Sequence, residues 1–368
     1  MKKVGIGIVG CGAISGIYME NITKMFKEIE IIGICDIVAE KAKAKSEEFG
    51  GLHIYKDMTE LFKDPAVEIV LNLTRPYEHF DVTSAAIAAG KHVYSEKPLG
   101  ATFEEGKKLM ELAKAANVLI GGAPDTFMGA GIQTCRKLID DGVIGDVVGA
   151  AAFMVCRGHE TWHPDPAFYY QFGGGPMLDM GPYYVTALIS MLGAVDTVSG
   201  MTKASFPTRL ITSEPKSGEV VKVETSTYIT GLMNFASGAI GTIFTTFDAY
   251  VAEVPRIEIY GSKGTLSVPD PNYFGGPIRL YRPEAGQFHE VPLMFDYPEN
   301  SRGLGVADMA KYLSTGKGFR AKSELTYHVL EVLTSFEKSS AAGAHIKLET
   351  TCERPVPMIP GGLMGVIN

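Results

Sequence analysis

The chain has 368 residues, of which 46% are hydrophobic and 21% charged, and its formal net charge is −8 at pH 7. A chain of this length predicts two domains, because a single hydrophobic core seldom extends over so many residues. The acidic balance excludes the usual nucleic-acid binders, no apolar run is long enough to span a membrane, and five scattered cysteines without a CxxC pair favour a reducing cytoplasm over disulfides or a zinc site.

A short apolar strand is predicted over residues 4–9, and a glycine-rich loop over residues 10–15 follows it directly. In a turn from a strand to a helix, the first glycine permits a tight reversal and the second lets the backbone approach a pyrophosphate. Free N–H groups and the dipole at the start of the next helix then favour the anion. The residues predicted to bind the cofactor in this loop are Gly10, Cys11, Gly12, Ala13 and Ile14.

The second strand, predicted over residues 30–35, ends in Asp36, about twenty residues beyond the glycine loop. A carboxylate at this place accepts hydrogen bonds from the ribose hydroxyls of adenosine and repels a 2′-phosphate. Ile37 and Val38 follow, so no adjacent arginine is present to bind that phosphate. The sequence therefore predicts NAD as the cofactor, with NADP less favoured.

Strands and helices continue to alternate, with helices predicted over residues 39–49, 80–89 and 103–116 and strands over 67–73, 92–95 and 118–121. This alternation predicts an α/β domain, a doubly wound parallel sheet whose ligands bind beyond the carboxyl ends of the strands. The loops at that edge should converge on the cofactor. Their residues predicted to contact it are Thr74, Arg75, Pro76, Glu96 and Lys97.

From residue 146 onward the pattern changes to strands separated by Gly, Pro and Ser turns. Strands are predicted over residues 146–157, 195–206, 219–234, 239–248, 254–260 and 264–268, and helices over 131–141, 182–192, 302–315 and 323–341. This indicates an α+β domain with a large, mostly antiparallel open sheet that has helices on one face and a partner surface on the other. We therefore expect a Rossmann domain over residues 1–122 and a substrate-binding and oligomerisation domain over 123–368. Its apolar C-terminal segment is expected to pack on the N-terminal domain or on a neighbouring subunit, with a disordered tail as the alternative.

The glycine run at residues 173–175, followed by Pro176, should bring the backbone close to a flat neighbour and then begin a helix that carries Asp179 and Tyr183. At a spacing of four residues, the two side chains would share one helix face. The carboxylate suits accepting a hydrogen bond from a substrate hydroxyl, and the phenol suits relaying the hydroxyl proton together with Lys97, whose ammonium would stabilise a phenolate. We predict these three residues as catalytic; a local hydrogen-bonding role for Asp179 and a core role for Tyr183 are the alternative.

Residues 159–163 read His-Glu-Thr-Trp-His and match the HExxH signature of zinc proteases. That chemistry needs both histidines on one face of a continuous helix. A glycine precedes the segment and a proline follows it, so we expect a loop and predict no metal. The loop would place Trp162 and His163 over the pocket, as an aromatic plane and a hydrogen-bonding ring; a loop held in place by its own tryptophan is the equal alternative. Asp125, after the last strand of the first domain, is predicted to line the same cleft.

Together these stretches resemble the Gfo/Idh/MocA family of glucose–fructose oxidoreductases and inositol dehydrogenases. The resemblance spans nearly the whole chain and rests on the glycine loop, Asp36, the segment 74–79, the tripeptide EKP at 96–98 and GGGPMLDMGPYY at 173–184. It implies a Rossmann domain, a C-terminal domain whose open sheet forms dimers or tetramers, and oxidation or reduction of one secondary alcohol of a sugar, polyol or related cyclic compound. It also implies that His79 lies near the nicotinamide end of the cofactor, with a structural role at a helix start as the alternative.

The leading hypothesis is an NAD-dependent dehydrogenase of a small carbohydrate or polyol, with Lys97 and Tyr183 as the proton relay and Asp179 holding the substrate. Inositol dehydrogenases of the family have histidine where this chain has Tyr183, which favours another sugar or a glycoside over inositol. A second hypothesis is a glycoside-cleaving enzyme that transiently oxidises sugar C3 and then returns the electrons. A third is a dinucleotide-binding regulator without catalysis. We expect a cytoplasmic homodimer or homotetramer.

Overall fold

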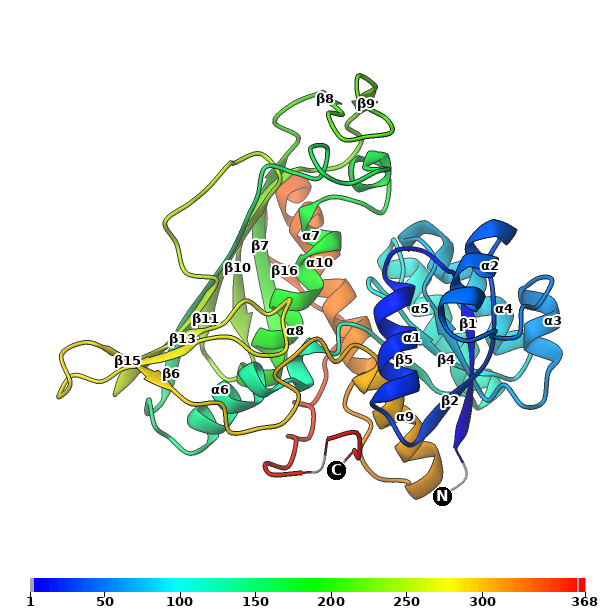
Figure 1. Ribbon diagram of the computed structural model, residues 1–368. Helices are drawn as coiled ribbons and strands as arrows, with labels where there is room; N and C mark the ends of the chain where they lie inside the picture. The colour runs from blue at the N-terminus through cyan, green and yellow to red at the C-terminus, as the bar shows by residue number, and fades with distance from the viewer. Residues whose placement is uncertain (1–2, 363, 368) are drawn as a thin grey trace. The chain divides into compact units, whose positions relative to one another are not determined.

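The computed structural model describes residues 3–362 and 364–367, and these residues form two compact units. The N-terminal unit contains the described residues of Met1–Ala130, Met294–Tyr327 and Pro355–Asn368, and the C-terminal unit contains Gly131–Leu293 and His328–Arg354. The boundary expected after residue 122 falls inside the first segment of the N-terminal unit, to which two later segments also belong. In Figure 1 these later segments are orange and red, and the first segment is blue to cyan.

The N-terminal unit is built on a five-stranded parallel sheet in the order β2-β1-β3-β4-β5. Its strands are β1 (Val4–Val9), β2 (Ile29–Cys35), β3 (Ile69–Asn72), β4 (His92–Ser95) and β5 (Ile120–Gly122), and its helices are α1 (Ser15–Lys24), α2 (Ala39–Glu48), α3 (Met58–Lys63), α4 (His79–Ala88), α5 (Phe103–Ala116) and α9 (Leu304–Thr315). All residues of β1 are buried, as in a parallel strand that is covered on both faces. Because β2 and β3 flank β1, the switch point of this sheet lies at the carboxyl ends of β1 and β3.

The described part of the C-terminal segment packs on the N-terminal unit. The Ile367 N–H donates to the carboxylate of Glu28 at 3.0 Å, and the Ile367 side chain is 2% exposed. Further upstream, the Arg320 guanidinium donates to the Val356 carbonyl at 3.0 Å and pairs with the buried Asp308 of α9. Hydrogen bonds and the burial of apolar side chains, Met358 and Ile367 among them, therefore fix a segment that has no regular secondary structure.

The C-terminal unit is built on a nine-stranded sheet in the order β15-β14-β13-β12-β6-β11-β10-β7-β16. All neighbouring strands are antiparallel except β6 and β11, which are parallel, so the predicted large and mostly antiparallel sheet is confirmed. The strands are β6 (Val147–Val155), β7 (Val195–Lys203), β10 (Tyr228–Phe235), β11 (Ile240–Thr246), β12 (Ile257–Gly261), β13 (Gly264–Val268), β14 (Ile278–Tyr281), β15 (Phe288–Val291) and β16 (Ile346–Lys347), with β8 (Thr208–Leu210) and β9 (Val220–Lys222) in a separate hairpin. Its helices are α7 (Pro176–Asp179), α8 (Gly181–Leu192) and the larger parts of α6 (Ala130–Asp140) and α10 (Ser323–Ala342). The first residue of α6 and residues 323–327 of α10 belong to the N-terminal unit.

Helices cover one face of the nine-stranded sheet, and α8 and α10 are seen on this side in Figure 1. Gly231 of β10 lies against Phe336 of α10, where an added Cβ would come within 2.3 Å of the ring. The next residue, Leu232, points to the opposite face and is 49% exposed. By register Met201 and Ile240 share that face, and they are 76% and 60% exposed. This face, from β7 across β10 to β11, is called the open face below.

The observed strands of this unit differ from the sequence prediction in two main respects. The strand expected over residues 219–234 is interrupted and forms β9 and β10. The edge strands β14 and β15 were not predicted from the sequence. Each is four residues long; β14 pairs with β13 and β15 pairs with β14. So short an alternation is not distinguishable from a loop.

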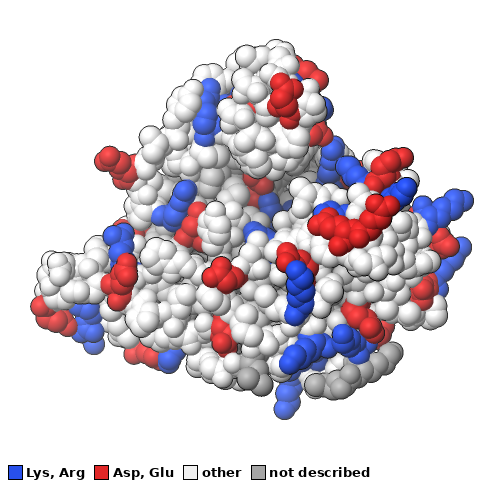
Figure 2. Space-filling model, in the orientation of Figure 1, with Lys and Arg blue, Asp and Glu red and all other residues white. Residues whose placement is uncertain are grey.

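The distribution of charged side chains on the surface and the state of the cysteine thiols agree with what the composition predicts. On the face drawn in Figure 2, Lys and Arg side chains are interspersed with Asp and Glu. All five cysteines are free thiols, and Cys11, Cys35 and Cys135 are buried. Among the described residues, no helix is at once long and apolar enough to cross a membrane.

Candidate active site

The glycine loop joins β1 to α1 in the N-terminal unit. Gly10 has φ +103°, and an added Cβ would come within 2.7 Å of the Leu73 carbonyl oxygen, so this position requires glycine. At Gly12 an added Cβ would meet no atom within 4 Å. The N-cap of α1, Ile14, makes no side-chain cap hydrogen bond to the helix start. The loop thus offers open space beside a helix N-terminus, the arrangement that a pyrophosphate group needs.

Asp36 ties the end of β2 to the glycine loop. Its carboxylate accepts hydrogen bonds from the Cys11 N–H at 2.7 Å and the Val38 N–H at 2.8 Å. A carboxylate can accept about four hydrogen bonds, so these two leave capacity for ribose hydroxyls. The Cys11 thiol is buried, and burial raises its pKa to about 12. Cys11 therefore stays neutral in the loop, and its side chain has a packing role.

A buried network links the loops that follow β3 and β4. Asn72, the last residue of β3, accepts a hydrogen bond from the Thr74 hydroxyl at 2.6 Å and donates to the His79 carbonyl at 3.2 Å. The His79 ring is buried, with its nitrogens 2.7 Å from the Pro98 carbonyl and 3.0 Å from the Thr74 carbonyl. Burial is the main cause that lowers the pKa of His79. Sequence reasoning missed Asn72, although a polar residue ending a buried strand was a usable signal. The other predicted residues of this loop are the exposed Arg75 and Pro76, which begins a short turn of helix.

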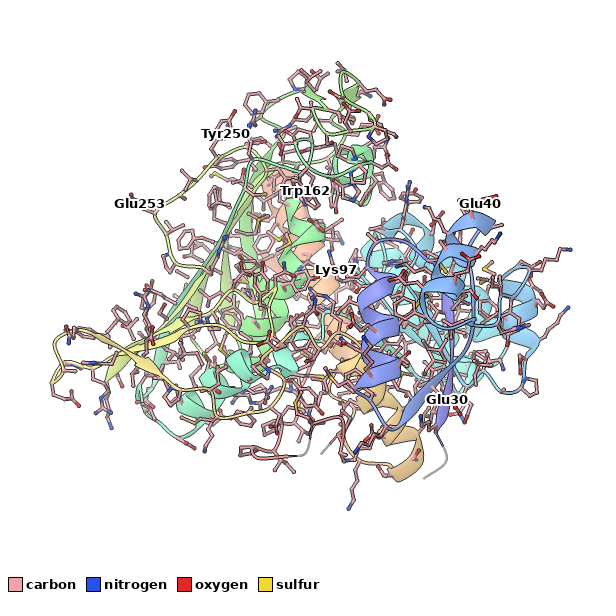
Figure 3. All side chains as sticks on the ribbon, viewed as in Figure 1. Glu30, Glu40, Lys97, Trp162, Tyr250 and Glu253 are labelled. Atoms are coloured by element: carbon pink, nitrogen blue, oxygen red, sulfur yellow. The ribbon has the colours of Figure 1, made fainter. Side chains whose placement is uncertain are left out.

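Lys97, which is labelled in Figure 3, lies two residues after the end of β4 and is half-buried. The buried carboxylate of the preceding residue, Glu96, accepts the Lys97 N–H at 2.9 Å and the hydroxyl of Tyr18 at 2.7 Å. Burial and the charge of Glu96 raise the pKa of Tyr18 well above its ordinary value, so the phenol remains a donor. Glu96 therefore anchors the backbone of Lys97 to α1. Its predicted contact with the cofactor stays a prediction.

Asp125 follows β5 and is 1% exposed. One of its carboxylate oxygens accepts the N–H of Gly303 at 2.9 Å and the N–H of Gly305 at 3.0 Å, at the start of α9. Burial raises the pKa of Asp125 to about 6. These contacts give Asp125 a role in holding α9, and its contact with substrate stays a prediction.

In the C-terminal unit, Asp179 and Tyr183 lie on two consecutive helices. The single helix expected from Pro176 onward is wrong, because α7 ends at Asp179 and α8 begins at Gly181. Pro182 lacks the N–H that a continuous helix would donate to the carbonyl of residue 178. Asp179 still donates its N–H to the Gly175 carbonyl at 2.9 Å, and the Tyr183 side chain is 7% exposed.

The glycine run before α7 approaches the protein's own backbone. An added Cβ at Gly174 would come within 2.5 Å of the Phe168 carbonyl, and one at Gly175 within 2.8 Å of the Ser226 carbonyl. Close approach, which the sequence predicted here, therefore serves the packing of this run against the segment 157–172 and against Ser226.

The segment 157–172 carries an aromatic cluster. Residues 158–164 belong to no helix or strand, so the predicted loop is confirmed. The His159 ring stacks on Tyr169 with centroids 3.8 Å apart, and Trp162 lies 5.2 Å from His159. Trp162, marked in Figure 3, is the one tryptophan of the chain and is 62% exposed. His163 accepts the Asp165 N–H on Nδ1 at 3.0 Å, and partial burial lowers its pKa, so its neutral ring carries the proton on Nε2.

A buried charge network holds the same segment. The Arg209 guanidinium of β8 pairs with Glu160 at 3.2 Å and with Asp248, and the Tyr170 hydroxyl donates to Glu160. The Asp248 carboxylate also accepts the Thr227 hydroxyl at 2.8 Å. The network joins the segment to the β8–β9 hairpin and to the residues that follow β11. It was invisible in the sequence, where its members are far apart.

Two family models match the chain over most of its length. The model of the oxidoreductase family with an NAD-binding Rossmann fold (GFO_IDH_MocA) matches residues 4–122, and the GFO/IDH/MocA C-terminal domain matches residues 132–267. The chain belongs to the Gfo/Idh/MocA family of oxidoreductases. The predicted family, enzyme class and NAD cofactor are thereby confirmed.

Members of this family are similar to the chain at modest identity. Myo-inositol 2-dehydrogenase of Thermotoga maritima is 27% identical over 71% of this chain and 74% of its own length. D-glucoside 3-dehydrogenase of Escherichia coli is 21% identical over 93% of this chain and 97% of its own length. D-xylose dehydrogenase of Paenarthrobacter nicotinovorans is 29% identical, but only 41% of its length is matched. Levoglucosan dehydrogenase, solved with NADH and L-sorbose, shares the fold with a TM-score of 0.81 at 19% identity, over 95% of this chain and 100% of that one.

The N-terminal unit fits an NAD cofactor by its own geometry. The open space at Gly12 and the start of α1 suit the pyrophosphate, and the carboxylate of Asp36 suits the adenosine ribose. Lys97 belongs to this unit, whereas Asp179, Tyr183, Trp162 and His163 belong to the C-terminal unit.

Proposed function

We propose that the protein is an NAD-dependent dehydrogenase that oxidises a secondary alcohol of a sugar, a glycoside or a cyclic polyol. The observation that carries the proposal is the position of Lys97, at the carboxyl end of β4 on a backbone held by Glu96. Ligands of a doubly wound sheet bind at this edge, which supports a role for the lysine as a proton-transfer group. Relatives named as dehydrogenases of myo-inositol, D-glucoside and levoglucosan support the substrate class.

Bound NAD supplies the hydride acceptor of this reaction. In the proposed mechanism, the Tyr183 phenol and the Lys97 amine form the relay that takes the proton of the substrate hydroxyl. The carboxylate of Asp179 accepts a hydrogen bond from the substrate and orients it. The hydroxyl oxygen loses its proton to this relay, and the carbon that bears the hydroxyl loses a hydride to NAD, so the alcohol becomes a ketone. Trp162 and His163 are proposed to contact the sugar ring.

The test is turnover of a panel of free sugars, inositols and aryl glucosides with NAD or NADP, followed by the absorbance of NADH. We expect a rise with one substrate class, and a kcat/KM that falls by about 10²- to 10⁴-fold in Lys97→Ala and Tyr183→Phe. Two matched controls should keep full activity: Lys108→Ala, on an exposed position of α5, and Tyr184→Phe, beside Tyr183 in the core of α8. Wild-type activity in both relay variants would contradict the mechanism.

The same panel separates the two alternative functions. A flat absorbance trace with release of the aglycone from an aryl glucoside would favour redox-assisted glycoside cleavage, in which NAD is regenerated in each cycle. A flat trace without release, together with tight binding of NADH, would favour a non-catalytic regulator.

The open face supports a homodimer or homotetramer in our proposal. Its exposed apolar residues Met201, Leu232 and Ile240 lie on three adjacent strands, and patches of this kind mark protein interfaces. Leu232→Asp should shift the mass measured by light scattering to that of a monomer. Val251→Asp, at a residue that is 83% exposed outside the sheet, is the matched control and should leave the mass unchanged. A cytoplasmic location stays a prediction.

A further inference from the structure

Asp179 has an imidazole partner that comes from the aromatic loop. His159 Nε2 lies 3.4 Å from Asp179 Oδ2, and the two side chains are 10% and 13% exposed. The residues are twenty positions apart in the sequence and belong to the same compact unit. The pair is therefore a feature of the fold of this unit and involves a histidine that the mechanism above does not use.

The His159 ring is held on several sides. One face stacks on Tyr169 with an interplanar angle of 21°, and Phe247 meets the ring edge-on with centroids 4.8 Å apart. The backbone N–H of His159 donates to the Tyr170 hydroxyl at 3.3 Å. The following residue, Glu160, belongs to the buried charge network. These contacts hold the plane of the imidazole, and in this plane Nε2 faces the carboxylate.

The chemistry of the pair defines the tautomer. A carboxylate only accepts hydrogen bonds, so Nε2 of His159 has to carry a proton. Nδ1 is buried and has no hydrogen-bond partner among the described residues, so the neutral ring is better left unprotonated there. With Nε2 protonated, the 3.4 Å contact with Oδ2 restrains the plane of the Asp179 carboxylate. A carboxylate has about four acceptor positions, so a carboxylate restrained in this way can also accept a substrate hydroxyl in a constant direction.

We propose that His159 is a positioning residue that orients the carboxylate of Asp179. The inference rests on the proposed function, in which Asp179 contacts the substrate. It assigns a role to the first histidine of the HExxH segment that is neither metal binding nor simple packing. It also explains why the segment is anchored so firmly at Glu160, since a mobile segment could not hold a carboxylate to within a fraction of an ångström.

Two variants separate the contact of His159 Nε2 with Asp179 from the ring stacking. His159→Phe keeps an aromatic ring against Tyr169 and removes the donor, whereas His159→Gln keeps a donor and removes the ring. For the substrate with the highest turnover in the panel, we expect kcat/KM to fall about 10- to 100-fold in His159→Phe and to recover most of this loss in His159→Gln. Binding of NADH should be unchanged in both. Full activity in His159→Phe, or a greater loss in His159→Gln, would overturn the proposal.

A double-mutant cycle distinguishes failure of this inference from failure of the proposed function. If Asp179→Asn alone keeps full activity, then the role of Asp179 in the proposed function is wrong, and the present inference is overturned with it. If Asp179→Asn loses activity, His159→Phe should add no further loss in that background, because both changes remove the same interaction. An additive loss would show that His159 acts elsewhere and would overturn this inference while the proposed function stands.

A spectroscopic readout is independent of turnover. In a long-range ¹⁵N–¹H spectrum at neutral pH, the His159 ring should be protonated on Nε2. A ring protonated on Nδ1 alone would overturn the proposal, since Nε2 would then have no proton to donate. The thermal unfolding of His159→Phe and His159→Gln, followed by Trp162 fluorescence, establishes that both variants are folded before their kinetics are compared.

Discussion

Arg209→Met would break the buried charge network that holds the segment 157–172. In the wild-type protein the Arg209 side chain is 3% exposed and pairs with Glu160 and Asp248, whose side chains are 7% and 6% exposed. Methionine keeps much of the apolar stem but leaves two buried carboxylates without their cation. Breaking a buried pair in this way costs about 3–5 kcal/mol. For a domain of 150–250 residues, the melting temperature should then fall by roughly 6–20 °C.

Thermal unfolding followed by the fluorescence of Trp162 measures this effect, because the tryptophan lies two residues after Glu160. The matched control is Lys222→Met in the same hairpin, which removes an exposed pair whose lysine is 78% exposed and should cost less than about 1 kcal/mol. The triple variant Arg209→Met, Glu160→Gln, Asp248→Asn carries no buried charge and should recover much of the lost stability. If Arg209→Met melts at the temperature of the Lys222→Met control, the reasoning from buried charge pairing is refuted.

Three further predictions concern the N-terminal loop and one buried histidine. Gly10→Ala should lower the melting temperature, because its Cβ would come within 2.7 Å of the Leu73 carbonyl oxygen. Gly12→Ala should melt like the wild type and weaken NADH binding in a fluorescence titration. Equal melting temperatures of the two variants would contradict the different roles given to the two glycines. Asp36→Ala should raise the ratio of kcat/KM for NADP to that for NAD by at least about tenfold, since it removes the charge that repels the 2′-phosphate, and an unchanged ratio would count against it. Burial lowers the pKa of His328 from 6.5 to about 4, so the unfolded chain binds the proton first as the pH falls. Urea titrations should therefore show stability that is present above pH 6.5 and falls toward pH 4 by up to about 3 kcal/mol, with a smaller fall in His328→Gln.

The sequence could predict the features that are decided within a few residues of one another. The strand over Val4–Val9, the glycine loop and Asp36 follow from local burial, backbone freedom and charge, and the structure has them at the predicted places. The position of Lys97 after β4 was predictable for the same reason, because a short apolar strand and the residues that end it form one local signal. The break between α7 and α8 was also within reach, since the missing N–H of Pro182 can be read from the sequence.

The tertiary structure alone decided which distant residues are partners. His159 meets Asp179, His79 joins the loops after β3 and β4, and Arg209 meets Glu160 and Asp248 across long separations in the chain. A sequence shows that each of these side chains can donate or accept a hydrogen bond, but many partners would satisfy that capacity equally well. The choice among them depends on how the segments fold back on the two sheets, and that geometry is a property of the packed chain as a whole.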